Sequence, residues 1–228
     1  MPLLKELNLP VNKKPVITID GPAGAGKSTV SKILAKRLGF IYIDTGALYR
    51  SVALAVKQAG CDPQDIHSLK KLFSQIFFDF RQTENGLSLY MNDENVSELI
   101  RTPEISMLAS TTSAIPEVRE FLLDIQRKMG EEGGAVFEGR DMGTVVFPKA
   151  EIKFFLMADH KVRAKRRFNE LDPDSTSMEE VSKAMKQRDE QDSQRKIAPL
   201  KPDDGAIVID STDLDIDGVV NKMLEIIN

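Results

Sequence analysis

The chain has 228 residues, 41% of them hydrophobic, and a formal net charge of −4. This length supports one sizeable hydrophobic core with room for a smaller appended lobe. The acidic balance argues against a nucleic acid polymer as partner, so any anion site must be local. The single cysteine, Cys61, excludes an internal disulfide.

The apolar segments are too short to place the chain in a membrane. No uninterrupted apolar run approaches the ~20 residues that span a bilayer, and residues 1–14 lack the apolar core of a signal peptide. We therefore expect a cytoplasmic protein with no membrane partner. No long exposed apolar stripe argues for obligate assembly, so we expect a monomer.

Short apolar strands alternate with helical segments along the chain. The strands are predicted at residues 16–19, 40–43, 135–137, 152–157 and 206–209. Such alternation favours an α/β fold in which a central five-stranded parallel sheet is covered by helices on both faces.

A glycine-rich run follows the first predicted strand. It completes the pattern G-x-x-x-x-G-K-[ST], and apolar residues at helical spacing follow it. Glycines let backbone N–H groups turn toward the phosphates of a nucleoside triphosphate, Lys27 places a charge near the outer phosphates, and the Ser28 hydroxyl can bind Mg²⁺. The predicted nucleotide-binding residues are Gly21, Pro22, Ala23, Gly24, Ala25, Gly26, Lys27, Ser28 and Thr29.

The middle of the chain departs from this alternation. Residues 76–81 and 87–91 are strand-like and flank Asn85-Gly86, a hairpin-turn dipeptide, which indicates an inserted antiparallel lobe. Thr102-Pro103 predicts a capped helix start, and Pro116 begins a second helix that runs to about Met129.

A second irregular region, residues 169–176, resembles the tip of a hinged helical lid. It lies between the helix that contains residues 163–167 and a capping-box sequence at Ser177. A simple surface excursion remains the alternative for both irregular regions. We expect a core at 1–60, 130–160 and 198–228, an inserted lobe at 61–129 and a lid at 161–197.

Several charged residues follow the predicted strands. Thr45 and Arg50 come after the second strand, and Arg140 and Asp141 come after the third. Because the carboxyl ends of parallel strands share one edge, these side chains would face the same cleft as Lys27.

Further cations lie on the helices of the predicted lid. Arg188, Asp192 and Arg195 have spacings of four and three, which places them on one helix face, although an exposed salt-bridged helix would show the same spacing. One or two of residues 165–167 could also reach a transferred phosphoryl group.

Phosphoryl transfer between two anionic substrates would explain why so many basic side chains are present. Its catalysis consists chiefly of positioning the substrates and neutralising their negative charge. The predicted catalytic residues are Lys27, Arg140, Arg188 and Arg195.

The glycine loop is accompanied by the motifs DTGALYR at 44–50, GRDMGTVVFP at 139–148, RDEQDSQR at 188–195 and APLK at 198–201. In these motifs the chain closely resembles bacterial cytidylate kinases of the P-loop kinase fold. The resemblance implies transfer of the γ-phosphoryl group of ATP, with Mg²⁺, to CMP or dCMP. It also implies that Ser110, Arg119 and Asp141 contact cytosine, Arg188 and Asp192 the sugar, and Thr45, Arg50, Arg140 and Arg195 the acceptor phosphate.

Two other functions share parts of this pattern. A GTP-binding switch uses the same loop, but neither Asn12-Lys13 nor Asn221-Lys222 is followed by Asp at the guanine-reading spacing N-K-x-D. A kinase for another small acceptor, such as UMP, AMP, a nucleoside or a metabolite acid, is the nearer alternative.

Overall fold

The structure is a computed structural model that describes residues 14–83, 86–171 and 176–227. The predicted central sheet is confirmed: five parallel strands lie in the order β2-β6-β1-β7-β8. The strands are β1 (Val16–Asp20), β2 (Ile41–Asp44), β6 (Ala135–Gly139), β7 (Ile152–Met157) and β8 (Ile207–Asp210). Since all run the same way, the ends of β1, β2 and β6 meet at one edge of the sheet.

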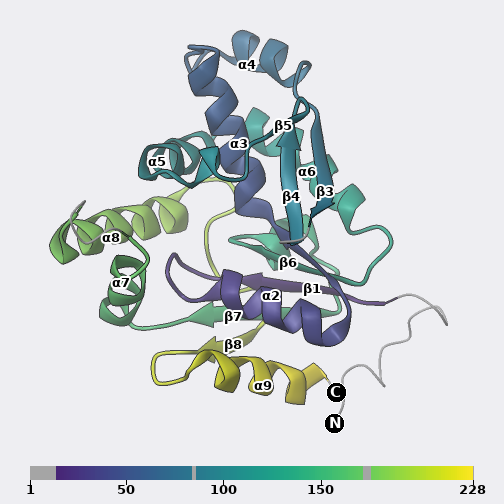
Figure 1. Cartoon of the computed structure of the whole chain (residues 1–228), viewed down its shortest axis with the longest axis vertical. Coiled ribbons are helices and arrows are strands. Elements are labelled where there is room, and N and C mark those ends of the chain that lie inside the picture. Colours follow the sequence, from purple (N-terminus) through teal and green to yellow (C-terminus); the bar gives the residue numbers. More distant parts are fainter. Residues whose placement is uncertain (1–13, 84–85, 172–175, 228) are drawn as a thin grey trace. The chain divides into compact units, whose positions relative to one another are not determined.

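Two helices, α2 (Lys27–Leu38) and α9 (Ile216–Ile227), run alongside the strands of this sheet (Figure 1). Alternate β1 residues Ile17 and Ile19 are fully buried in one core with Leu34 of α2 and Met223 of α9. The opposite face of β1 lies under η2 (Met142–Val146), where Gly143 contacts Thr18. All five residues of β1 are buried, and the alternating direction of its side chains separates the helical core from the η2 side.

Three of the other helices, α5 (Pro103–Thr112), α6 (Pro116–Met129) and α8 (Met178–Gln194), begin where the sequence signals predicted. The remaining helices are α3 (Thr45–Gln58), α4 (Ile66–Phe73), η1 (Leu99–Arg101) and α7 (His160–Phe168). The Thr102 side chain accepts from the N–H of Ile105, and Ser177 forms both bonds of a capping box with Glu180. These caps satisfy N–H groups that a helix start otherwise leaves unpaired.

The chain forms two compact units, Met1–Asp44 with Met129–Asn228, and Thr45–Lys128. In the second unit α3 packs against α5 and η1. Residues 45–58 therefore group with the inserted segment, whereas the sequence analysis assigned them to the core. The finer division into core, lobe and lid stays a prediction.

The second unit also holds an antiparallel sheet in the order β3-β4-β5. Its strands are β3 (Phe78–Thr83), β4 (Gly86–Met91) and β5 (Glu94–Asn95). The antiparallel pair β3 and β4 was predicted, but the two-residue β5 is too short to leave a pattern. Asn85 of the predicted turn, and residues 172–175 of the predicted lid tip, lie outside the described residues.

Among the helices that the structure describes, none combines the length and the apolar character needed to cross a bilayer. This agrees with the absence of a long apolar run in the sequence. The cytoplasmic location and the monomeric state stay predictions.

Candidate active site

The phosphate loop joins β1 to α2 and requires glycine where it packs against its neighbours. Gly21 has a φ of 149°, and a Cβ atom there would lie 2.0 Å from the carbonyl oxygen of Leu156 in β7. Gly24 has a φ of 70°, and a Cβ atom there would lie 2.8 Å from the carbonyl oxygen of Arg163 in α7. Only glycine fits both the backbone conformation and the space. The loop then delivers the chain to the N-terminus of α2, a favourable place for an anion.

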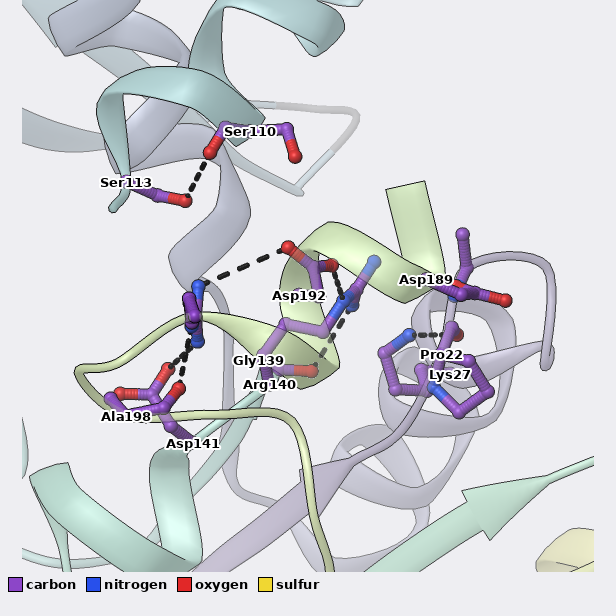
Figure 2. A network of polar contacts seen from close by, with 12 residues as sticks. Pro22, Lys27, Ser110, Ser113, Gly139, Arg140, Asp141, Asp189, Asp192 and Ala198 are labelled. Atoms are coloured by element: carbon purple, nitrogen blue, oxygen red, sulfur yellow. Dashed lines mark hydrogen bonds and ion pairs between the residues drawn. The ribbon is translucent and has the colours of Figure 1, made fainter. Parts of the chain in front are cut away.

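Lys27 is buried inside this loop. Its Nζ atom donates to the carbonyl oxygen of Pro22 at 2.8 Å (Figure 2). Burial, together with the positive charges of Arg140 and Arg188, holds the pKa of Lys27 well below its usual value, although Glu138 and Asp20 act in the opposite direction. A nearby anion would favour the charged form of the lysine. Lys27 and the nearby arginines thus place positive charge beside the loop, where the negative charge of a phosphate group would offset it.

Glu138, at the carboxyl end of β6, accepts hydrogen bonds from two hydroxyl groups. Ser28 Oγ donates to Glu138 Oε1 and Tyr42 Oη donates to Glu138 Oε2, both at 2.7 Å. Burial and the charge of Glu138 raise the pKa of Tyr42, so this phenol remains a donor. The sequence analysis did not select Glu138, because only the adjacency of β6 and β1 in the sheet brings its carboxylate to Ser28.

Ser28 and Glu138 together fit the requirements of a nucleotide-bound Mg²⁺ ion. Within the described residues no group of three or more His, Cys, Asp or Glu side chains could hold a metal ion by itself. Mg²⁺ in kinase sites is commonly held by one or two oxygen-bearing side chains together with substrate phosphates and water. A hydroxyl and a carboxylate beside the phosphate loop match that arrangement.

Asp20, the last residue of β1, links the phosphate loop to η2. Its carboxylate accepts from the backbone N–H of Met142 at 2.9 Å and of Gly143 at 2.8 Å. Burial is the main cause that raises the pKa of Asp20 to about 6; the two backbone hydrogen bonds and Lys27 counteract part of this rise, and Asp141 adds to it. The carboxylate fixes the turn that follows Arg140 and Asp141. The wide π-type turn of η2 is itself a form that occurs often at functional sites.

Two arginines and two aspartates form a buried network at this edge of the sheet. Asp192 Oδ2 accepts from Arg140 Nε at 3.0 Å, and Asp192 Oδ1 lies 3.9 Å from Arg195 Nη1. Asp141 Oδ1 accepts from Arg195 Nη2 at 3.4 Å. Figure 2 shows Asp192 beside Arg140, with Asp141 and Ala198 close to one another. The structure therefore brings together Arg140 and Asp141, predicted for this edge, with Asp192 and Arg195, predicted by their spacing to share a helix face; their roles in substrate binding stay predictions.

Backbone carbonyl groups hold these guanidinium groups in place. Arg195 Nε donates to the carbonyl oxygen of Ala198 at 2.6 Å, and Arg140 Nη1 donates to that of Gly139 at 3.2 Å. Ala198 has a φ of 50°, a strained conformation for a residue with a side chain, and such strain is often retained at functional sites. Burial alone would lower the pKa of Arg140, but Asp192 and Glu138 outweigh it and raise the pKa.

Four predicted substrate-binding residues, Thr45, Arg50, Ser110 and Arg119, belong to the second unit. Arg119 Nη1 donates to the carbonyl oxygen of Ser113 at 3.2 Å, and Ser113 Oγ donates to that of Ser110 at 2.8 Å. The Arg119 guanidinium also lies over the ring of Tyr49, 5.5 Å from its centroid. Ser110 and Arg119 are thus gathered around the turn between α5 and α6.

The basic run at the end of α7 makes contacts away from the phosphate loop. Arg166 donates to the hydroxyl and carbonyl oxygens of Ser211, and Arg167 donates to Glu170. Arg163 of α7 contacts the phosphate loop directly, since it donates to the carbonyl oxygen of Ala23 at 2.9 Å. No local sequence pattern marks Arg163 as a residue of the site, since its burial against the loop depends on the packing of α7.

Comparison with known proteins decides the family. The family model for cytidylate kinase matches residues 17–228. The chain belongs to the cytidylate kinase family. The cytidylate kinase of Syntrophotalea carbinolica is 46% identical over 219 residues, which cover 95% of this chain and 93% of that protein. The cytidylate kinase of Geobacter sulfurreducens is 48% identical over 214 residues, 93% of this chain and 92% of that protein.

Solved structures support the same fold at much lower identity. An uncharacterized protein from Eubacterium ventriosum superposes with a TM-score of 0.52 at 15% identity, covering 94% of this chain and 98% of that one. This match concerns the fold only. The family assignment rests on the sequence relatives, and membership of this kinase family is consistent with the phosphate loop and the arginine network.

Proposed function

We propose that the chain transfers the γ-phosphoryl group of ATP to CMP or dCMP and releases ADP and the pyrimidine nucleoside diphosphate. The observation that carries this proposal is the buried network of Arg140, Asp141, Asp192 and Arg195 at the sheet edge where the phosphate loop begins. A phosphate loop alone serves many nucleotide-binding proteins. A second cluster of guanidinium groups suits a second anion, as transfer between two nucleotides requires.

The donor nucleotide would bind at the phosphate loop. Backbone N–H groups of residues 24–26 and the N-terminus of α2 would hold its phosphates, with Lys27 beside the outer ones. Ser28, supported by Glu138, would hold Mg²⁺, which supplies neutralising charge to the phosphate oxygens when bound.

The acceptor attacks with an oxygen of its own phosphate group. A new P–O bond forms as the bond between the γ-phosphorus and the bridging oxygen of ADP breaks, and the charge spreads over the equatorial oxygens. Arg140 and Arg195 would neutralise the acceptor phosphate, and Arg188, whose charge already acts on Lys27, would neutralise the transferred group. An acceptor that is already ionised needs no general base from the protein.

Recognition of cytosine follows from its hydrogen-bonding edge. The base offers an exocyclic amine donor beside two acceptors, N3 and O2. Asp141 would accept from the amine, whereas uracil would place a carbonyl oxygen against the carboxylate. The family resemblance assigns Ser110 and Arg119 to the same base. It assigns Arg188 and Asp192 to the sugar, and Thr45 and Arg50 to the acceptor phosphate.

Assays of phosphoryl transfer across a panel of acceptors test this proposal. With ATP and Mg²⁺, we expect kcat/KM for CMP or dCMP to exceed the values for UMP and AMP by at least about tenfold, the discrimination expected from one buried polar contact. Equal turnover of all four monophosphates, or preferred turnover of another acceptor, would contradict it.

Asp141 offers a sharper test of base recognition. Asp141→Ala should reduce kcat/KM for CMP by about 10²-fold, because the buried acceptor for the amine is lost. The ratio of kcat/KM for CMP to that for UMP should therefore fall toward one. Binding of ATP in the absence of CMP should change by less than about threefold. Equal losses toward both nucleotides would count against the role of this carboxylate.

A further inference from the structure

A three-way contact ties the phosphate loop to helices α7 and α8. The N–H of Ala23 donates to Asp189 Oδ1 at 3.3 Å, and its carbonyl oxygen accepts from Arg163 Nη1 at 2.9 Å. Arg163 Nη1 also donates to Asp189 Oδ2 at 2.5 Å, which closes the ring of contacts. Both backbone groups of one loop residue are thus held by one ion pair, which we call the Ala23 clamp.

The two side chains of the clamp are largely buried, and Arg163 is anchored by a further contact. The side chain of Arg163 is 9% exposed and that of Asp189 17% exposed. Arg163 Nε donates to the carbonyl oxygen of Ala158, just beyond the end of β7. A guanidinium group with three acceptors in its plane has little freedom to turn. A buried ion pair adds little net stability compared with apolar residues of the same volume, so its geometry is its more informative property.

Close packing beside the clamp adds a second contact between the loop and the two helices. A Cβ atom on Gly24 would lie 2.8 Å from both the carbonyl oxygen of Arg163 and the Cε atom of Met185 in α8. Helices α7 and α8 therefore touch the loop at two successive residues, once through polar contacts and once through close packing.

The clamp joins the two halves of the proposed reaction. Asp189 directly follows Arg188 on α8, and the same helix carries Asp192 and ends at Arg195. The loop would hold the donor phosphates, while this face of α8 would hold the acceptor and the transferred group. Any change in the clamp would therefore alter the distance between the phosphate loop and the arginines of α8.

We propose that Arg163 and Asp189 are positioning residues. They fix the distance and orientation of the phosphate loop relative to the arginines of α8, as in-line transfer requires. This inference rests on the proposed function. Neither side chain needs to touch the reacting atoms. A displacement of about 1 Å between reacting groups can cost about 10²-fold in rate, so a modest shift of the loop is enough to matter.

Paired substitutions test the clamp. Arg163→Met keeps the bulk of the side chain and removes its donors. Asp189→Asn leaves a single acceptor oxygen, so the amide N–H₂ must face either the guanidinium of Arg163 or the N–H of Ala23. We expect each to lower kcat by about 10- to 100-fold while KM for ATP and the Kd of ATP change by less than about threefold. The double variant should lose no more than the worse single variant, because the two side chains pair with each other and hold the same loop residue, Ala23.

Matched controls come from ion pairs elsewhere in the same unit. Arg37→Met removes a guanidinium that donates to Asn221 and Asp217, and Glu170→Gln removes the carboxylate that pairs with Arg167 at the end of α7. Both pairs are exposed to solvent. Their kinetics should stay within about twofold of wild type, as expected for surface pairs.

Hydrogen exchange of the phosphate loop gives a readout independent of activity. The amides at residues 23–24 should exchange at least about tenfold faster in Arg163→Met and Asp189→Asn than in wild type, with unchanged exchange in β1. Wild-type kcat in both clamp variants, or exchange as slow as in wild type, would overturn the clamp. Loss of ATP affinity in parallel with kcat would also overturn it, since that indicates a structural role. Absence of phosphoryl transfer to CMP by the wild-type protein would instead refute the proposed function. The hydrogen-exchange rates would still show whether Arg163 and Asp189 hold the loop.

Discussion

Both compact units carry pairs of basic and acidic side chains, but the pairs differ in burial. In the first unit, Arg195 and Asp141 expose only 6% and 3% of their side chains. In the second unit, Lys57 and Glu104 form a shorter contact, 2.5 Å against 3.4 Å for Arg195 and Asp141, while exposing 47% and 67% of their side chains. Water screens the exposed pair. The buried charges are screened less, so their electrostatic interaction with a neighbouring charged group is stronger. Pairs of opposite charge are therefore solvated in one region, and in the other they have the burial that the proposed anion site requires.

The largest effect should come from the buried lysine of the phosphate loop. Lys27→Met should lower kcat/KM by about 10³-fold, since it removes a charge aimed at the transferred group. The unfolding midpoint without nucleotide should stay the same or rise, because burial and nearby arginines disfavour the charged lysine in the fold. Thermal unfolding and steady-state kinetics on the same sample check both. A lower midpoint would show that Lys27 stabilises the empty loop.

Arg195 tests the buried pair itself. Arg195→Met should lower kcat/KM for CMP by about 10²-fold. It should also destabilise the fold by about 3 kcal/mol, the usual cost of leaving a buried partner charge uncompensated. Adding Asp141→Asn should restore much of the stability without restoring activity. Denaturant unfolding of both variants measures this, and full recovery of turnover in the double variant would contradict a role of Arg195 in binding the acceptor.

Asp20 provides a pH-dependent test within the buried region. A carboxyl with a pKa of about 6 in the fold, above the ordinary value of 3.8, binds its proton more tightly when folded. Its contribution to the free energy of unfolding therefore increases as the pH falls from about 6 toward about 4. The same protonation removes an acceptor from the N–H groups of Met142 and Gly143.

Carboxyl NMR titration without nucleotide should report the raised pKa of Asp20 directly. The exchange protection of the Met142 and Gly143 amides should decrease through the same pH range. Nucleotide must be absent because a phosphate monoester also titrates at about pH 6. In Asp20→Asn the amides should exchange without this pH step. A titration near pH 4 would refute the predicted effect of burial.

The smallest effect should come from the exposed pair. Lys57→Gln should change the free energy of unfolding by less than about 1 kcal/mol, and 1 M salt should abolish the difference. Its kinetics should stay within about twofold of wild type. A larger loss would mean that burial is a poor guide to which charged pairs of this protein matter.

Local signals in the sequence predicted the helices that begin with a cap. Thr102 with Pro103 and Ser177 with Glu180 marked helix starts that the structure confirms, and Pro116 began a helix ending at Met129. Such signals suffice because each involves residues within one turn. The glycine pattern likewise predicted the loop between β1 and α2.

Contacts between distant residues were beyond such signals. Ser28 meets Glu138, Ala23 meets Asp189 and Asp20 meets Gly143 across separations of more than 100 residues. The sequence predicted that Asp141 and Asp192 bind substrate, but not that each also pairs with an arginine. Strand order, which places β6 beside β1, decides the contacts of Glu138 and Gly143, and the packing of α8 decides that of Asp189.

The amino-acid sequence by itself determined the α/β class, the phosphate loop and the set of charged residues available for phosphoryl transfer. These features depend on residue type and spacing along the chain. Only the tertiary structure decided which charges are buried, which partner each one has, and that Arg163 rather than the neighbouring basic residues contacts the loop. The physical reason is that burial and pairing depend on which strands and helices pack together, and packing is a property of the whole fold.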